Sequence, residues 1–290
     1  MNKKRLAIVG TGSLGTIIGA YLNEAGYVCD LFDTNVAHVK ALNEKGATVT
    51  GYVEKNVKVK AFTPDQMEGE YDYFFYIAKQ TANSIAVPQM AKHLKEDGCI
   101  VTMQNGLPEQ AIMDIVGKER VVGCPVGWGA TWLEPGVAKL TTPIDRAVFD
   151  LGEPDGKLTP RIEELKRMLD VMCHTEVTTN LLGVRWTKVL LNVTMSGINA
   201  VTGGTFGEDI GNAKAMDIVA RIAKECVVVG QAAGVKFEPF GGKIYIAEGS
   251  LWETEEEKQK VIATYSAAFG GTANPQKASM LQDLEKGLKT

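Results

Sequence analysis

The sequence has few of the features that mark several common protein classes. Its 290 residues include five cysteines, scattered and without a C-x-x-C pair, and three histidines without metal-ligand spacing. Dispersed thiols are typical of free cysteines in a reducing cytosol, so we expect a cytoplasmic location and no metal. The formal net charge is -4, which gives no basic field for nucleic acid or an anionic membrane. No apolar run long enough for a membrane span and no signal-peptide layout occur.

The strongest positive signal lies in the first 33 residues. Arg5 to Val9 reads as a buried strand, the turn Gly10-Thr11-Gly12-Ser13-Leu14-Gly15 follows, and 16–25 reads as a helix. A second strand, 28–32, ends on Asp33. A strand, a G-x-G-x-x-G turn, a helix, a strand and an acid within about 30 residues predict a Rossmann-type dinucleotide-binding fold. The alternative is an ordinary strand–helix turn that binds nothing.

Each residue type in this motif has an expected role. Gly10 permits the tight turn, Gly12 leaves room for a pyrophosphate, and Gly15 lets the helix pack closely on the strand. The helix N-terminus adds free N–H groups and the positive end of its dipole. Asp33 would accept hydrogen bonds from the adenosine ribose and would repel a 2′-phosphate. We therefore favour NAD(H) over NADP(H), unless Asp33 instead caps the next helix.

Strands and helices alternate through the first half, and helices alone follow Asn180. Later strands are predicted as pairs within 48–62, at 73–78, 99–102 and 120–123, as hairpin-like strands at 137–142 and 146–151, and at 175–177. Helices of the second half are predicted at 181–195, 213–233, 253–268 and 275–288. We expect an α/β doubly wound nucleotide-binding domain over 1–178 and an all-helical substrate domain over 179–290.

Polar residues follow the predicted strands of the first half. Ligands of doubly wound sheets bind beyond the carboxyl ends of the strands, so we expect the glycine turn, Asp33, Lys79 and Asn105 to face one crevice. The alternatives are a solvated surface lysine at 79 and a plain turn with a left-handed residue at Asn105-Gly106. In the helical half, Lys188 and Asn192 share a helix face. A polar pair on a largely apolar helix needs partners, which a cleft between domains would supply; the alternative is that Lys188 extends to solvent.

The order and spacing of these motifs resemble the ketopantoate reductase (2-dehydropantoate 2-reductase) family over essentially the whole chain. The residues that carry the resemblance are Ile8 to Gly15, Lys79, Gln104-Asn105-Gly106, Trp186-x-Lys188 with Asn192, and Ser279 to Asp283. The resemblance implies a 6-phosphogluconate dehydrogenase-like architecture with a Rossmann-type and an all-helical domain. It implies an oxidoreductase of pantothenate biosynthesis that uses NADP(H) to reduce a small 2-keto acid, ketopantoate. The sequence leaves the oligomeric state open, with a homodimer as one alternative.

The resemblance also implies roles, position by position. Lys188 is similar to the general acid that protonates the keto oxygen, with a pKa lowered by burial and by a second cation such as Lys79. Lys79 and Asn105 are similar to residues that hold cofactor and substrate. Asn192 and Ser279 are similar to ligands of a substrate hydroxyl and of the substrate carboxylate, respectively.

The chain also departs from the family's pattern. Asp33 replaces a basic residue expected beside a 2′-phosphate, and Ser196-Gly197 stands where Asn-Pro is common. We expect these departures, together with Asn199 and with Phe206 in place of an amide, to line the substrate side. A dehydrogenase of another 2-keto or 3-hydroxy acid is therefore a rival reading, and a nucleotide sensor without turnover is a rival from another class.

The last departure is the end of the chain. The family's signature helix carries a catalytic-site Glu at a position beyond Thr290, where this chain stops. Leu281, Leu284 and Leu288 keep the helical period without a stop signal. We expect a shortened chain that lacks its terminal helical turns and that Glu, with a natural frayed end as the alternative.

Overall fold

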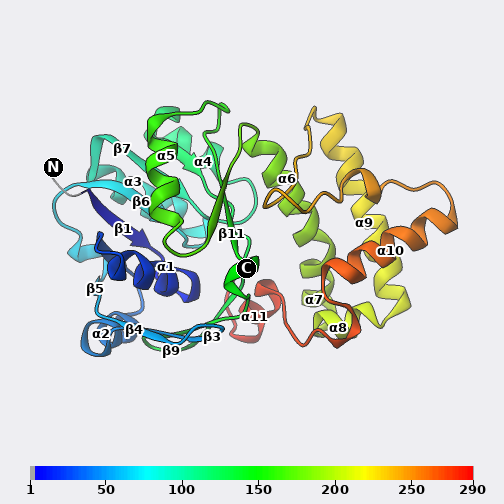
Figure 1. Ribbon diagram of the computed structural model, residues 1–290, viewed down its shortest axis with the longest axis horizontal. Coiled ribbons are helices and arrows are strands. Elements are labelled where there is room, and N and C mark those ends of the chain that lie inside the picture. Colours follow the sequence, from blue (N-terminus) through cyan, green and yellow to red (C-terminus); the bar gives the residue numbers. More distant parts are fainter. Residues whose placement is uncertain (1–3, 290) are drawn as a thin grey trace. The chain divides into compact units, whose positions relative to one another are not determined.

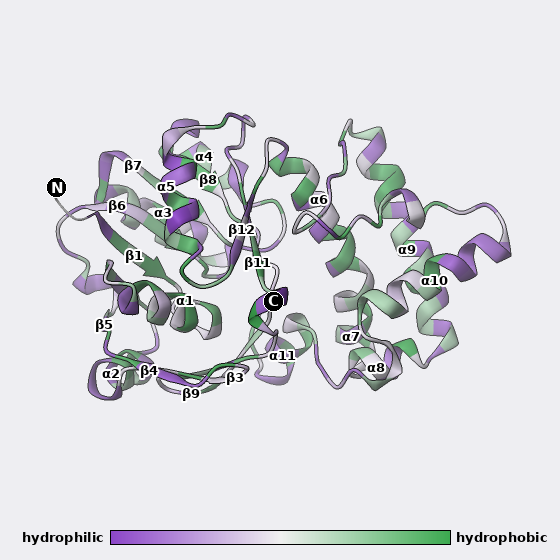
Figure 2. Cartoon of the chain, viewed as in Figure 1, coloured by the Kyte–Doolittle hydropathy of each residue, from purple (hydrophilic) through white to green (hydrophobic). Residues whose placement is uncertain are grey.

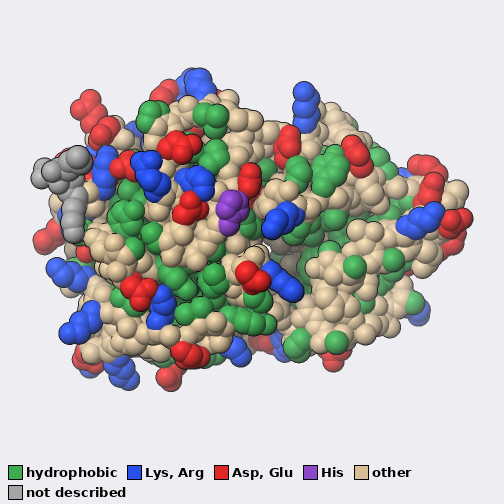
Figure 3. Space-filling view, viewed as in Figure 1, with side chains coloured by type: hydrophobic (Ala, Val, Ile, Leu, Met, Phe, Trp, Pro, Cys, Tyr) green, Lys and Arg blue, Asp and Glu red, His purple; other side chains and the backbone are tan. Residues whose placement is uncertain are grey.

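The structure is a computed structural model that describes residues 4–289. It divides into two compact units, Met1–Leu181 and Leu182–Thr290, and Figure 1 labels most of their helices and strands. Acidic and basic side chains are interspersed over the face seen in Figure 3. Across residues 4–289, no helix combines the length and the apolar character needed to cross a membrane.

A six-stranded sheet with parallel pairings throughout forms the centre of the first unit. In spatial order, its strands are β5 (Lys60–Phe62), β2 (Val28–Phe32), β1 (Arg5–Val9), β6 (Tyr71–Tyr76), β7 (Leu94–Thr102) and β8 (Val121–Gly123). From β1, the chain adds β2 and β5 towards one edge of the sheet, and from β6 it adds β7 and β8 towards the other. The strand order therefore reverses between β1 and β6, the switch point at which doubly wound sheets bind ligands.

The sequence of β1 explains why helices cover both faces of this sheet. Leu6 and Ile8 pack in one apolar cluster and Ala7 and Val9 in another, because alternate side chains of a strand point to opposite faces. The strand is accordingly green in Figure 2. The first cluster includes side chains of α1 (Ser13–Glu24), α2 (Val36–Lys45) and α5 (Pro160–Leu169). The second includes side chains of α3 (Asn83–Lys92) and α4 (Glu109–Val116).

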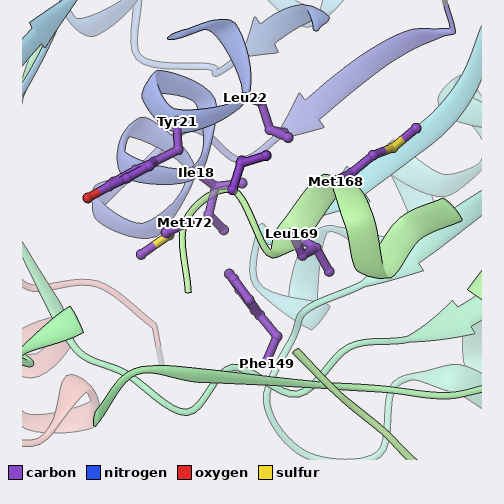
Figure 4. Close-up of a pocket in the computed structure, with 8 residues that line it drawn as sticks. Ile18, Tyr21, Leu22, Phe149, Met168, Leu169 and Met172 are labelled. Atoms are coloured by element: carbon purple, nitrogen blue, oxygen red, sulfur yellow. The ribbon is translucent and has the colours of Figure 1, made fainter. Parts of the chain in front are cut away.

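Helices α1 and α5 meet through apolar side chains, which Figure 4 shows converging with Phe149. The residues that line this contact are Ile18, Tyr21, Leu22, Phe149, Met168, Leu169, Val171 and Met172. The space between them is too small to admit a water molecule. The contact is therefore packed core and offers no room for a ligand.

Two smaller sheets complete the first unit. One has the order β4 (Lys55–Val57), β3 (Ala47–Gly51), β10 (Val137–Leu140) and β9 (Ala130–Glu134). The other pairs β11 (Val148–Leu151) with β12 (His174–Val177) in parallel. The predicted hairpin-like strands at 137–142 and 146–151 do not pair with each other, so that prediction is wrong. Instead, β10 pairs antiparallel with β9 across a turn at Gly136 (φ +82°). The predicted strand pairs within 48–62 hold for β3 and β4, whereas β5 joins the main sheet.

Helices make up most of the second unit. They are α6 (Leu181–Leu191), α7 (Gly197–Thr202), α8 (Phe206–Ile210), α9 (Ala213–Ala232), α10 (Glu255–Ala268) and α11 (Ser279–Glu285). The core of this unit forms around α9, which contributes Val219, Ala223 and Val227, and around Tyr265 of α10. The dense apolar positions of 213–233 predicted such a buried helix. The chain thus combines a Rossmann-like α/β unit with a helical one.

The prediction that the last helix runs from 275 to 288 is wrong at both ends. Helix α11 begins at Ser279 and ends at Glu285. Gly287 has a φ of +69°, and the N–H of Leu288 donates to the carbonyl of Asp283 at 2.9 Å. A glycine with left-handed geometry is a common helix stop, so the leucine period does not extend the helix. Thr290, beyond which a further Glu is expected, lies outside the described residues.

Candidate functional site

The glycine turn joins β1 to α1 and is fixed to the end of β2. The N–H groups of Gly10 and Thr11 donate to the carbonyl of Phe32, at 2.9 and 3.2 Å. The Thr11 hydroxyl donates to the same oxygen at 3.0 Å, and Thr11 is fully buried. Thr11 is among the predicted cofactor-binding residues, but both of its donors are already used. Thr11 therefore shapes the turn. The next main-chain N–H donors, those of Gly12, Ser13 and Leu14, lie at the N-terminus of α1.

The three glycines of the motif have different surroundings. Gly10 has a φ of +91°, and a Cβ there would lie 2.4 Å from the nitrogen of Ala78. A Cβ on Gly15 would lie 2.8 Å from the carbonyl oxygen of Gly10. A Cβ on Gly12 would meet no heavy atom within 4 Å. The fold therefore requires Gly10 and Gly15, whereas Gly12 leaves open space beside the N-terminus of α1, which fits a bound pyrophosphate.

Asp33 follows β2 and is held in an Asx-type turn. Its Oδ1 accepts the N–H of Asn35 at 2.9 Å. The cap of α2 is Asn35, whose side chain accepts the N–H of His38 at 3.1 Å, so the alternative that Asp33 caps this helix is wrong. An ionised carboxylate has about four acceptor positions. The partly exposed Asp33 therefore keeps acceptor capacity beyond the bond to Asn35.

The loops that follow β6 and β7 are joined by hydrogen bonds. The buried Gln104 donates from Nε2 to the carbonyl of Ala78 at 2.5 Å, and Gln80 donates to the carbonyl of Asn105 at 2.6 Å. Lys79 and Asn105 are both exposed on these neighbouring loops. Gln104 has a supporting role that the sequence did not indicate. The left-handed residue of the Asn105 turn is the glycine after it, which has a φ of +80°.

The predicted residues of the first unit thus follow four neighbouring strands of one parallel sheet. Asp33 follows β2, the glycine turn follows β1, Lys79 follows β6 and Asn105 follows β7. Carboxyl ends of parallel strands meet at one edge of the sheet, the edge used for ligands in doubly wound folds. Lys188, Asn192 and Ser279 belong to the second unit.

Lys188 lies on α6 and is only 9% exposed. Its Nζ lies 5.6 Å from the ring centroid of Phe240, within the range of a cation–π contact. The hydroxyl of the preceding residue, Thr187, donates to the carbonyl of Glu238 at 2.6 Å. Both contacts connect α6 to the segment 238–240. A lysine extended into solvent, which was the alternative prediction, does not describe this side chain.

Asn192 begins a π-helical turn, Asn192–Ser196, which interrupts the predicted continuous helix over 181–195. The N–H of Gly197 donates to the carbonyl of Asn192, which gives the wider i to i+5 spacing. The hydroxyl of the buried Thr194 donates to the carbonyls of Leu190 and Leu191, at 2.7 and 3.0 Å. Thr194 thereby satisfies carbonyls near the change of spacing. Such single turns frequently occur at functional sites, and the sequence analysis missed this one.

Ser279 is exposed at the first position of α11, which packs against the π turn and α7. The N–H of Ala278 donates to Oδ1 of Asn199 at 2.8 Å, and Nδ2 of Asn199 donates to Asp209 at 2.6 Å. Asn199 is fully buried, so the expectation that it lines the substrate side is wrong: its amide fixes the start of α11. The ring of Phe206 packs against the apolar core of this unit.

Comparisons with known proteins assign both parts of the chain. Residues 6–155 match the family model of ketopantoate reductase PanE/ApbA, and residues 180–290 match that of its C-terminal part. The chain belongs to the ketopantoate reductase family. It is 26% identical, over 289 residues, to a 2-dehydropantoate 2-reductase of Pyrococcus horikoshii, covering 99% of this chain and 86% of that relative.

Solved structures share the fold over nearly the whole chain. A 2-dehydropantoate 2-reductase from Geobacter metallireducens GS-15 is 24% identical with a TM-score of 0.81, covering 99% of this chain and 88% of the other. A D-mandelate dehydrogenase with NADH and anilino(oxo)acetate is 20% identical with a TM-score of 0.82, covering 97% and 85%. These likenesses agree with the Rossmann-like and helical units described above.

Proposed function

We propose that this chain is a nicotinamide-dependent reductase that converts ketopantoate to pantoate. The observation that carries the proposal is the match of both parts of the chain to the ketopantoate reductase family. The relative from Pyrococcus horikoshii, named for this reaction, aligns with 99% of the chain. The buried Lys188 and the open space at Gly12 supply the two chemical requirements, a proton donor and a place for the dinucleotide.

The dinucleotide would be held by the glycine turn. The N-terminus of α1 offers N–H groups and the positive end of its dipole to the pyrophosphate, and Asp33 would accept hydrogen bonds from the ribose. A bound nicotinamide supplies the hydride. NAD(H) is favoured because a 2′-phosphate beside Asp33 would be a like-charge contact. The next basic residue along the chain is Lys40, whose Nζ lies 3.8 Å from Oε1 of Glu44 and whose side chain is 71% exposed. The D-mandelate dehydrogenase of similar fold also holds NADH.

The proton would come from Lys188. An ammonium both donates the proton and stabilises the negative charge that develops on the keto oxygen, and positioned acid catalysis contributes about 10²–10⁴-fold. Asn192, one helical turn further on, and Ser279 would bind the substrate's hydroxyl and carboxylate. Lys79 and Asn105 would hold cofactor and substrate from the loops after β6 and β7. The proposal requires these groups of the two units to meet around one substrate.

The test is the oxidation of NADH and of NADPH by the purified chain in the presence of ketopantoate. We expect saturable turnover with a lower KM for NADH than for NADPH. Higher kcat/KM for another acid in a panel of 2-keto acids would identify a reductase of that acid instead. Binding of NADH without turnover of any 2-keto acid would contradict the proposal and indicate a nucleotide sensor.

A further inference from the structure

His38 is a buried histidine of α2, only 1% exposed, that the proposed reaction does not use. Its Nδ1 accepts the N–H of Gly136, in the turn between β9 and β10, at 2.9 Å. Its Nε2 lies 2.9 Å from the carbonyl oxygen of Thr11 and 3.2 Å from the hydroxyl of Thr16. The ring therefore connects the glycine turn to a strand pair that lies about a hundred residues further along the chain.

These partners determine where the imidazole carries its proton. A main-chain N–H such as that of Gly136 only donates, so Nδ1 of His38 must be the acceptor. The proton is then on Nε2, from which it is donated to the carbonyl of Thr11. The Thr16 hydroxyl lies 2.8 Å from the carbonyls of Thr11 and Gly12, so it also has an acceptor for its own proton. A second proton on the ring would oppose the Gly136 N–H, and the arrangement therefore needs a neutral histidine.

The bond from His38 also sets the direction of the next N–H along the turn. The peptide bonds of the described residues are all trans, and in a planar trans peptide the carbonyl and the following N–H point in opposite directions. The Thr11 carbonyl is directed inward, to His38. The N–H of Gly12 in the same peptide group is therefore directed away from the core, at the residue whose missing Cβ leaves open space.

We propose that His38 is a positioning residue of the nucleotide-binding turn: its neutral ring holds the Thr11 carbonyl and so directs the Gly12 N–H towards the phosphates of the dinucleotide. The identity of the ligand rests on the proposed function. The inference adds a residue outside the glycine motif and connects cofactor affinity to the β9–β10 hairpin through Gly136. Hydride transfer itself does not involve His38, so its loss should act on cofactor binding.

The test compares His38→Leu, which removes the donor to the Thr11 carbonyl, with His174→Leu, a matched control whose side chain is 62% exposed and contacts Glu176. Each variant is titrated with NADH. Its thermal unfolding is also recorded, so that the Kd is measured at a temperature at which the variant is folded. We expect the NADH Kd of His38→Leu to rise roughly tenfold, because the hydrogen bond that holds the Thr11 carbonyl is lost. The KM for NADH should rise similarly with little change in kcat, and His174→Leu should match the wild type. A purely structural role would lower the melting temperature and leave the Kd of the folded variant unchanged.

A second measurement uses the unaltered protein. Because the chain has only three histidines, the ring nitrogens can be assigned by NMR. We expect one ring to be neutral with its proton on Nε2, and its signals to shift when NADH is added. A proton on Nδ1 of His38, or equal NADH affinity in His38→Leu and wild type, would overturn the inference alone. Wild type that binds neither NADH nor NADPH would contradict the proposed function as well.

Discussion

The substitution Gly12→Ala separates ligand binding from folding at the glycine turn. Because a Cβ at Gly12 meets no atom within 4 Å, we expect the free energy of unfolding to fall less than it does for a glycine of the same motif whose Cβ would clash. The added methyl group fills space that the proposal assigns to the pyrophosphate. The affinity for NADH should therefore fall at least roughly tenfold, which corresponds to about 1.4 kcal/mol of binding free energy.

The matched control is Gly15→Ala, in the same motif. Its Cβ would lie 2.8 Å from the Gly10 carbonyl oxygen and 3.0 Å from Cγ2 of Ile8. Overpacking costs about 1–3 kcal/mol, and the better helix propensity of alanine offsets about 1 kcal/mol because Gly15 lies within α1. Since a main-chain oxygen yields little, we expect a net loss of stability of roughly 1–2 kcal/mol.

The assay combines urea unfolding with NADH titration of both variants and the wild type. Lost affinity with the smaller loss of stability is expected for Gly12→Ala, and the larger loss of stability for Gly15→Ala. The reasoning would be refuted if Gly12→Ala bound NADH as well as the wild type. It would also be refuted if Gly12→Ala unfolded as easily as Gly15→Ala.

Two further substitutions test the roles of acidic residues. Asp33→Asn removes the carboxylate that should repel a 2′-phosphate. The ratio of kcat/KM for NADPH to kcat/KM for NADH should therefore rise roughly tenfold or more in steady-state assays. An unchanged ratio would show that Asp33 does not determine cofactor choice. Asp209→Ala removes the acceptor of the buried Asn199 amide, which fixes the start of α11. The KM for the keto acid should therefore rise while the KM for NADH stays constant. Equal changes in both KM values would contradict this role.

Much of the first unit could be predicted because its signals are local. Within 33 residues, β1, the glycine turn, α1 and β2 are each encoded by apolar periodicity or by a glycine. The strand pairing of short segments was less accessible, because it depends on distant partners. The three residues of β5 pair with β2 across the main sheet, and β10 pairs with both β9 and β3. No local pattern distinguishes these partners from a neighbouring strand.

The candidate site shows the same division. Gly12, Asp33 and Lys188 were predicted from motif and resemblance, since each occupies a recognisable place in its element. The role of Asn199 was not predicted, because its side-chain amide is hydrogen-bonded to Asp209 and to a main-chain N–H 79 residues away. A polar residue that supports a site through buried partners has the same local sequence pattern as one that faces a ligand.

The π turn at 192–196 is a similar case. Its spacing follows from how α6 continues into α7, with the Thr194 hydroxyl satisfying two carbonyls of the preceding turn. A threonine inside an apolar helix is the only sequence signal, and it is compatible with an ordinary α-helix as well. Helical periodicity therefore predicted the helix and not its change of spacing.

The most direct test of the proposed chemistry is the kcat for ketopantoate reduction by wild type, Lys188→Ala and Lys188→Arg, with the NADH Kd measured on the same preparations. Arginine keeps the positive charge but does not release its proton in proteins, so it separates proton donation from charge. We predict that both variants lose about 10²–10⁴-fold in kcat while the NADH Kd stays at the wild-type value, because the glycine turn belongs to the other unit. Wild-type kcat in either variant would contradict the assignment of Lys188 as the proton donor.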